Sequence, residues 1–253
     1  MKHAGASRSS RGRRADIVLV ERGLAQSRSA ARAAIEAGRV RANGVEIEKP
    51  AQLVLENATF EYAPAHPYVA RSALKLLAAL DRFALSPRGF VGLDLGASTG
   101  GFTEVLLLRG ATKIYALDVG HGQLHSRLLS DPRVVSLEGR NARALSLRDV
   151  AEPPEFVTAD VSFISLKLAL PQALSLAKPG AWMVALIKPQ FEAGRAKLGK
   201  GGIVRDESDR QAACNAVRAW LSNEQGWRVD DIIESPIAGG DGNREYLIAA
   251  HKP

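Results

Sequence analysis

The stretch GLDLGASTGGFTEVLLLRG, residues 92–110, places a buried strand, a glycine-containing loop and a helix in immediate succession. An apolar run passes Asp94 and reaches Gly96, small residues and two further glycines follow, and a helical pattern ends at Gly110. Loops of this kind hold NAD, FAD or S-adenosylmethionine after the first strand of an α/β sheet. The dinucleotide fingerprint G-x-G-x-x-G is absent, because Ala97, Ser98 and Thr99 follow Gly96.

Strand and helix patterns alternate on the C-terminal side of this stretch. After the strand at 89–96 and the helix at 100–110, further strands are expected at 112–120, 133–138, 154–162 and 181–190. The intervening patterns predict helices at 121–130, at 165–180 with an interruption at Pro171, and at 206–226; strands at 227–235 and 244–252 close the chain. Strands separated by helices indicate a parallel sheet covered on both faces.

In such sheets the ligand lies beyond the carboxyl ends of the strands. The residues predicted at these ends are Asp94, Asp118, Glu138, Asp160 and Lys188. Asp94 suits a ligand with a cationic amino-acid moiety and no phosphate, and Asp118, 24 residues later, suits a ribose diol. Together they favour S-adenosyl-L-methionine as cofactor, although either acid alone could instead cap a helix.

Four polar residues are expected at this edge of the sheet: Lys75, Asp160, Lys188 and Glu245. Each has a simpler interpretation, since Lys75 lies off the apolar face of its helix and could be solvated, and Asp160 could cap a helix. Two lysines and two carboxylates suit methyl transfer to a ribose 2′-hydroxyl. That reaction needs an aligned displacement and removal of a weakly acidic proton.

Positive charge is concentrated at the N-terminus. The chain has 253 residues with 34 Lys+Arg and 27 Asp+Glu, a net charge of +7. Residues 1–44 hold ten Lys+Arg and three Asp+Glu, also +7, which leaves 24 of each sign in the remainder. Such a local excess suits RNA or DNA, although residues 2–14 alone read as a solubilising tail. The single Cys214 excludes an internal disulfide framework and a cysteine-based zinc site.

The basic residues accompany an organised pattern. Two short helices are expected around ADIVLVERGL, with Leu24 available for the core, and SRSAARAAIEAG, with Ser27 as N-cap and Gly38 after its end. Asn43-Gly44 predicts a hairpin turn, and AQLVLENATFEY supplies one or two further strands. The run at 14–47 resembles the RNA-binding module named after a small-subunit ribosomal protein. This resemblance implies structured RNA as a partner.

The domains follow from these patterns. We predict a basic flexible tail at 1–13, an α+β RNA-binding domain at 14–62 and a linker at 63–67, within the proline-containing APAHPY. The second domain is predicted at 68–253. Its fold class is expected to be α/β, a Rossmann-like methyltransferase sheet that is parallel with one antiparallel strand.

Several motifs resemble one family over nearly the whole chain from about residue 14. ARSALKL, LDLGASTGGFTEVLLLRGA, YALDVGHGQLHSRLLSDPRV, ADVSFISL, LIKPQFEAG and GNREYL are similar to the hemolysin-A-like (TlyA) family of ribosomal RNA 2′-O-methyltransferases, which belongs to the FtsJ type. The resemblance implies an rRNA (cytidine-2′-O)-methyltransferase acting on ribosomal RNA or ribosomal subunits. One departure is YVARSALKL, where Ala70 and Ser72 replace the serine and glycine that flank the arginine in most members.

The family's Lys-Asp-Lys-Glu tetrad falls on Lys75, Asp160, Lys188 and Glu245, with Lys188 as the central catalytic lysine. Cofactor contacts are implied for Asp94, Gly96, Ser98, Thr99, Gly100 and Asp118. The basic residues expected to contact RNA are Arg14, Arg28, Arg32, Arg39, Arg41, Arg71, Arg195, Lys197 and Lys200. Of these, Arg195, Lys197 and Lys200 lie in the glycine-rich segment 191–206. That segment is either a mobile surface loop or a flap that grips the RNA backbone.

Four other functions fit the sequence less well. A base methyltransferase acting on amines would carry an asparagine-proline-proline-aromatic motif after the fourth strand, where this chain has Asp160-Val161-Ser162-Phe163. A cytosine-C5 enzyme would need a reactive cysteine, whereas Cys214 lies in a helical pattern among alanines. A hemolytic protein lacks support from any membrane-length amphipathic segment, and the tetrad argues against a non-catalytic ribosome binder. We expect a cytoplasmic protein that needs no metal and no membrane.

Overall fold

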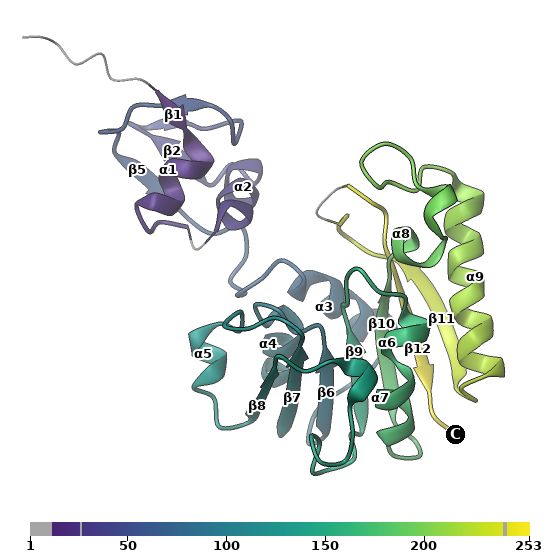
Figure 1. Ribbon diagram of the computed structural model, residues 1–253. Helices are drawn as coiled ribbons and strands as arrows, with labels where there is room; N and C mark the ends of the chain where they lie inside the picture. The colour runs from purple at the N-terminus through teal and green to yellow at the C-terminus, as the bar shows by residue number, and fades with distance from the viewer. Residues whose placement is uncertain (1–11, 26, 240–241) are drawn as a thin grey trace, which may run out of the picture. The chain divides into compact units, whose positions relative to one another are not determined.

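The computed structural model describes residues 12–25, 27–239 and 242–253. The chain divides into two compact units, residues 1–67 and 68–253 (Figure 1). Residues 1–11 of the predicted basic tail lie outside the described residues. Arg13, which was also assigned to that tail, instead forms the strand β1 (Arg13–Arg14), which pairs antiparallel with β4 (Leu53–Val54).

The first unit packs two helices against short strands. The helices are α1 (Ala15–Glu21) and α2 (Arg28–Glu36), and a sheet in the order β3-β2-β5 joins Val45–Glu46, Val40–Ala42 and Phe60–Tyr62. Ser27 caps α2 as predicted, because its side chain accepts a hydrogen bond from the amide of Ala30. Asn43 and Gly44 have φ of 51° and 78°, which confirms the predicted turn between β2 and β3.

The small core of this unit differs from one expectation. Ala15, Val18 and Leu19 of α1 pack against Ala31, Ala34 and Ile35 of α2 and against residues of the strands. Leu24 is 37% exposed, so the prediction that it belongs to the core is wrong. The reason is that α1 ends at Glu21 and the chain turns at Gly23, with φ of 69°, which carries Leu24 away from the helix face.

A seven-stranded sheet in the order β11-β12-β10-β9-β6-β7-β8 forms the centre of the second unit. β12 pairs antiparallel with both neighbours and the remaining pairs are parallel, which confirms the predicted sheet. The strands are β6 (Val91–Leu95), β7 (Lys113–Asp118), β8 (Val134–Glu138), β9 (Phe156–Ala159), β10 (Trp182–Ile187), β11 (Arg228–Glu234) and β12 (Tyr246–His251).

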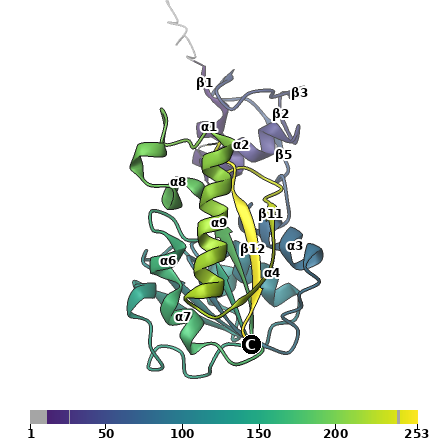
Figure 2. The same cartoon turned by 90° about the vertical axis from the view of Figure 1, so that its right-hand side faces the viewer.

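Helices cover both faces of this sheet. One buried cluster joins it to α6 (Leu166–Ala169), α7 (Pro171–Leu176) and α9 (Glu207–Asn223). The other joins it to α3 (Ala73–Arg82), α4 (Gly101–Leu108) and α5 (Ser126–Leu129). Figure 2 shows α6, α7 and α9 on one side of the strands and α3 and α4 on the other. Successive residues of a strand face opposite sides, so both faces of a central strand are apolar, as the continuous runs predict.

Shorter helices complete the unit. A four-residue helix, α8 (Pro189–Glu192), follows β10, and two 3₁₀ turns lie at Ala142–Ala144 and Arg195–Lys197. The predicted helix at 121–130 is confined to α5, because Glu138 accepts hydrogen bonds from the amides of Gln123 and Leu124 and holds that segment as a loop. No helix of the described residues has both the length and the apolar character that crossing a membrane requires.

Candidate active site

The four predicted tetrad residues meet at the carboxyl edge of the sheet. Lys75 Nζ lies 2.6 Å from Glu245 Oε2 and 3.9 Å from Asp160 Oδ2, and Lys188 Nζ lies 2.7 Å from Asp160 Oδ1. Asp160 therefore lies between the two ammonium groups, with one carboxylate oxygen facing each. Opposite charges in a buried cluster compensate one another, which makes their removal from water tolerable.

The burial of Lys75 corrects one interpretation of the sequence. Its side chain is 7% exposed, so the alternative of a solvated helix lysine is wrong. α3 buries Ala73, Leu76, Ala79 and Leu80 in the apolar layer, and Lys75 extends from the same helix to Glu245, 170 residues away in the sequence. A helical wheel shows only the apolar face. It does not show that a carboxylate from the last strand meets the polar face.

Lys188 lies at the boundary between β10 and α8. The strand is buried throughout and Pro189 begins the helix, so the backbone turns at the lysine and leaves its side chain 9% exposed. Besides Asp160, its Nζ donates a hydrogen bond of 2.7 Å to Ser162 Oγ. Ser162 was not assigned a role from the sequence, although its place two residues after Asp160 could have suggested one.

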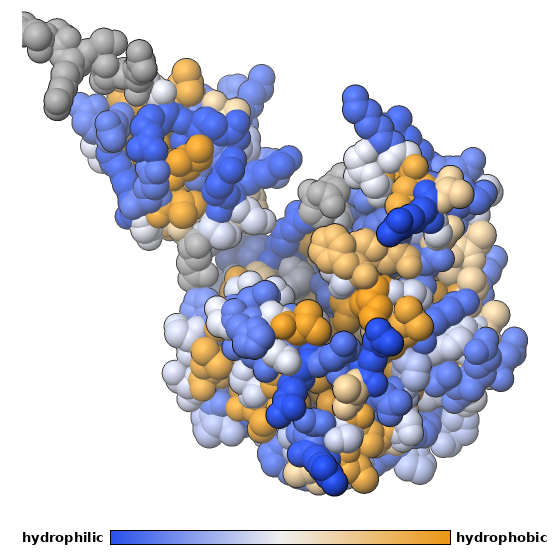
Figure 3. Space-filling view, viewed as in Figure 1, coloured by the Kyte–Doolittle hydropathy of each residue, from blue (hydrophilic) through white to orange (hydrophobic). Residues whose placement is uncertain are grey.

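Two phenylalanines lie close to these polar groups. Phe163 is 91% exposed and has φ of 63°, a conformation that non-glycine residues rarely adopt. Its ring lies 5.3 Å from the ring of Phe191 in α8, at an angle of 49°. Hydrophobic residues gather over the region of α6 and α8 in the space-filling view (Figure 3). An exposed and strained aromatic side chain beside charged groups indicates a binding role rather than a packing role.

The glycine loop after β6 is close to the tetrad. Gly96 has φ of 77°, and a Cβ at this position would lie 2.7 Å from the carbonyl oxygen of Asp160. At Gly100, with φ of 100°, a Cβ would lie 2.1 Å from a methyl carbon of Leu128. Only glycine permits both the conformation and the close approach. The loop and Asp160 are thus in backbone contact, with Ser98 exposed and Thr99 partly exposed between the two glycines.

Asp94 lies beneath this loop. It is buried, and its two oxygens accept hydrogen bonds from Thr103 in α4 at 2.7 Å and from Thr158 in β9 at 2.9 Å. Burial raises the pKa of Asp94 to about 7, against the lowering effect of these two hydrogen bonds. Its alternative role as a helix cap does not apply, because the residue before α4 is Gly100.

Asp118 and Glu138 hold loops at the ends of the next two strands. Asp118 is partly exposed and accepts hydrogen bonds of 2.8 Å from the amides of Ser98 and Gly120. It thereby connects β7 directly to the glycine loop. The amides of Gln123 and Leu124 lower the pKa of Glu138, which keeps that carboxylate charged. Val119, next to Asp118, is 66% exposed at the same edge.

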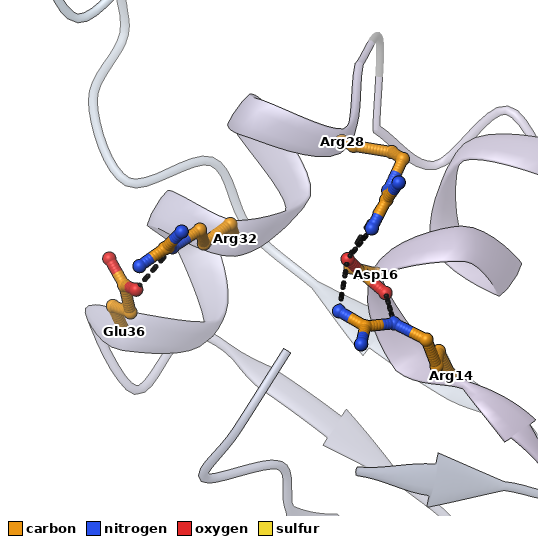
Figure 4. Close-up of polar contacts among 5 residues, drawn as sticks. All are labelled: Arg14, Asp16, Arg28, Arg32 and Glu36. Atoms are coloured by element: carbon orange, nitrogen blue, oxygen red, sulfur yellow. Dashed lines mark hydrogen bonds and ion pairs between the residues drawn. The ribbon is translucent and has the colours of Figure 1, made fainter. Parts of the chain in front are cut away.

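Some of the arginines predicted to contact RNA already have acidic partners. Arg14 and Arg28 both bind Asp16, at 3.0 and 2.9 Å, and Arg32 pairs with Glu36 at 2.7 Å (Figure 4). Hydrogen bonds from Arg14 and then Arg28 lower the pKa of Asp16 to about 2, although its burial opposes the shift. These side chains stabilise the first unit internally, and their charge is partly neutralised.

Most of the other basic residues predicted to contact RNA form no ion pair with an acidic side chain of the described residues. Lys197 pairs with Asp209 at 2.8 Å. Within the described residues no ion pair is formed by the side chains of Arg39, Arg41, Arg71, Arg195 and Lys200. All except Arg71, which is partly exposed, are exposed. An exposed guanidinium or ammonium without an acidic neighbour keeps its full charge for a phosphate. The structure therefore separates the predicted RNA contacts into paired and unpaired groups.

Comparison with known proteins matches the two units of the chain to two different family models. Residues 68–252 match the family model of the FtsJ-like methyltransferases, and residues 13–60 match that of the S4 domain. The chain is 45% identical, over 93% of its length and 88% of the relative's, to the 16S/23S rRNA (cytidine-2′-O)-methyltransferase TlyA of Mycobacterium tuberculosis.

Two further relatives cover most of the chain. Hemolysin A of Brachyspira hyodysenteriae is 40% identical over 92% of this chain and 98% of its own length. A solved structure of a relative from Streptococcus thermophilus is 39% identical, with a TM-score of 0.76, over 96% of this chain and 90% of that chain. With its S4 domain and a sheet edge that brings four tetrad side chains together, the chain belongs to the FtsJ-like methyltransferase family.

Proposed function

We propose that this protein methylates the ribose 2′-hydroxyl of a cytidine in ribosomal RNA, with S-adenosyl-L-methionine as the methyl donor. The observation that carries the proposal is the contact of Lys188 and Lys75 with Asp160, and of Lys75 with Glu245, beside the glycine loop. The relative from Mycobacterium tuberculosis, at 45% identity, bears the name of an enzyme with this activity.

The residues of the glycine loop fit this cofactor. Asp118 is partly exposed and its carboxylate can accept hydrogen bonds from a ribose diol, next to the exposed side chain of Val119. We assign cofactor binding to Gly96, Ser98, Thr99, Gly100 and Asp118. Asp94, which the sequence assigned to the cofactor as well, is buried with both oxygens bonded to Thr103 and Thr158, and we assign it instead to holding α4 against β9. When bound, the cofactor supplies a methyl group already activated on a sulfonium.

Lys188 is assigned to the 2′-oxygen of the substrate. Asp160 and Ser162 hold its Nζ at 2.7 Å each, so its position is fixed before the substrate binds. As an ammonium it would stabilise the developing oxyanion, and as an amine it would accept the hydroxyl proton. Lys75 lies 3.9 Å from the second oxygen of Asp160 and is itself held by Glu245 at 2.6 Å, so that two positive and two negative side chains balance within the cluster.

We assign the contacts with RNA to two parts of the chain. We propose an RNA-binding domain that starts at β1 and covers residues 13–62, a linker at 63–67 and a methyltransferase domain at 68–253. Arg39 and Arg41 contribute unpaired positive charge from the first domain, and Arg195 and Lys200 do so beside α8. Since the proposed substrate is ribosomal RNA, the protein is expected to act in the cytoplasm.

Two features favour the ribose over the base. The position after β9 holds Asp160-Val161-Ser162-Phe163, and Lys188 engages both Asp160 and Ser162 there. Cys214 is buried in α9, and burial raises its pKa to about 12. A thiol with this pKa is not the nucleophile that a cytosine-C5 methyltransferase requires.

The proposal is tested by analysis of the product. Purified ribosomal subunits lacking the modification are incubated with the protein and methyl-labelled S-adenosyl-L-methionine, and the digested nucleosides are separated by mass spectrometry. We expect the label in 2′-O-methylcytidine, with none in samples that lack the protein. Label confined to a base-methylated nucleoside, or no transfer to either subunit, would contradict the assignment.

Phe163 is assigned to the base of the target nucleotide. Replacement of Phe163 by Ala should lower kcat/KM for ribosomal RNA by about 5- to 150-fold, since stacking of one base on an aromatic ring contributes about 1–3 kcal/mol. Phe163→Tyr keeps the ring and should stay within a few-fold of the wild type. Steady-state kinetics with ribosomal subunits measures both variants.

The variant Phe163→Gly distinguishes the loss of base stacking from a change in backbone strain at this position. Glycine adopts the observed φ of 63° without strain, so this variant should fold at least as stably as Phe163→Ala while losing the same activity. Full activity in both variants would show that the ring does not contact the substrate.

A further inference from the structure

Glu192 connects the two segments that carry the catalytic side chains. It lies at the end of α8, four residues after Lys188. Its Oε2 accepts a hydrogen bond of 2.6 Å from Ser165 Oγ, and its Oε1 accepts one of 2.7 Å from the amide of Leu166. Ser165 and Leu166 form the start of α6, and the Ser165 hydroxyl also accepts a hydrogen bond from the amide of Lys167.

The loop fixed in this way carries the groups around Lys188. It runs from Asp160 to Ser165, and its first residue is held by a hydrogen bond of 2.9 Å from the Asp160 amide to the carbonyl of Leu95. Between the two fixed ends lie Ser162, which binds Lys188 Nζ, and Phe163, with its positive φ and exposed ring. A loop with a strained residue keeps one conformation only if its ends are fixed.

Glu192 is engaged within the protein. Its two oxygens accept hydrogen bonds from Ser165 and Leu166 at the start of α6, and its side chain is partly buried. Burial raises the pKa of Glu192, against the lowering effect of the hydrogen bonds from Ser165 and Leu166. Its removal would leave the Leu166 amide and the Ser165 hydroxyl without this partner, and the loop would lose its second fixed end.

We propose that Glu192 is a positioning residue that holds Ser162 and Phe163 in place over Lys188, so that the ammonium group and the target ribose meet in one geometry. The inference rests on the proposed ribose methyltransferase activity. It adds a residue outside the tetrad and assigns its action to the loop rather than to the reacting atoms.

The test compares Glu192→Ala and Glu192→Gln in the full chain, with ribosomal subunits as substrate. Glu192→Ala should lower kcat by about 10²-fold, because a displacement of about 1 Å at a reacting group costs that much. The affinity for S-adenosyl-L-methionine, measured by calorimetry, should change less than about threefold. Glu192→Gln should recover most of the activity, because the amide oxygen still accepts from Leu166 and its amino group can donate to Ser165 Oγ.

Glu155→Ala is the matched structural control. Glu155 also accepts a backbone hydrogen bond, of 2.9 Å from Val91, and pairs with Lys178 at 3.0 Å, but it precedes β9 at the opposite edge of the sheet. Its loss should lower Tm and leave kcat unchanged. Wild-type kcat in Glu192→Ala, or an equal loss of kcat in Glu155→Ala, would overturn the inference. Absence of 2′-O-methylation by the wild type would instead refute the proposed function.

Discussion

Replacement of Lys188 by alanine should reduce ribose methylation by at least about 10³-fold, the effect expected for removal of a group that handles the proton or the oxyanion. Lys188 lies 2.7 Å from Asp160 and from Ser162, and its side chain makes no hydrogen bond or ion pair with the described residues of the glycine loop. The affinity for S-adenosyl-L-methionine should therefore stay close to that of the wild type. Single-turnover methylation and calorimetry measure the two quantities.

Lys178→Ala serves as the control for this prediction. Lys178 precedes the same strand, is exposed, and forms one ion pair of 3.0 Å with Glu155. Its removal deletes a lysine and an ion pair without touching the tetrad, so methylation should stay at the wild-type rate. If Lys188→Ala retained wild-type activity, a mechanism centred on this lysine would be wrong.

Deletion of residues 1–62 should weaken binding to ribosomal RNA by about 10²-fold or more and reduce its dependence on salt. This segment contains Arg39 and Arg41, whose guanidinium groups are exposed and have no acidic partner among the described residues. Each phosphate contact that is lost should reduce the slope of log K against log salt by about 0.7 to 0.9. Filter binding or fluorescence anisotropy over a series of salt concentrations measures the slope.

Point variants in the full-length chain measure how much individual arginines contribute to the salt dependence of RNA binding. Arg39→Ala and Arg41→Ala together should reduce the slope by about 1.4 to 1.8, that is, by about 0.7 to 0.9 for each contact. Arg32→Ala should have a smaller effect, because Arg32 pairs with Glu36 at 2.7 Å and part of its charge is neutralised before RNA binds. A salt slope that is the same in the deletion and in the wild type would exclude the first unit as the main RNA contact.

Much of the fold could be predicted from local signals. The Asn43-Gly44 turn and the Ser27 cap were found because a two-residue hairpin and a helix N-terminus each demand particular side chains at fixed positions. The alternation of strands and helices predicted the parallel sheet, and the predicted fold class included its one antiparallel strand. Predictions failed where a distant group intervened, as when Glu138 holds residues 123 and 124 in a loop instead of a helix.

The sequence by itself determined which residues could form a site, because residues at the ends of parallel strands share one edge of the sheet. Only the tertiary structure decided which of them make contact. Lys75 meets Glu245 across 170 positions, and Glu192 reaches Ser165 across 27. A charged side chain can be buried only beside a partner that compensates it, and that partner can come from anywhere in the chain. Local patterns therefore identify the strand ends, and packing alone selects the partners.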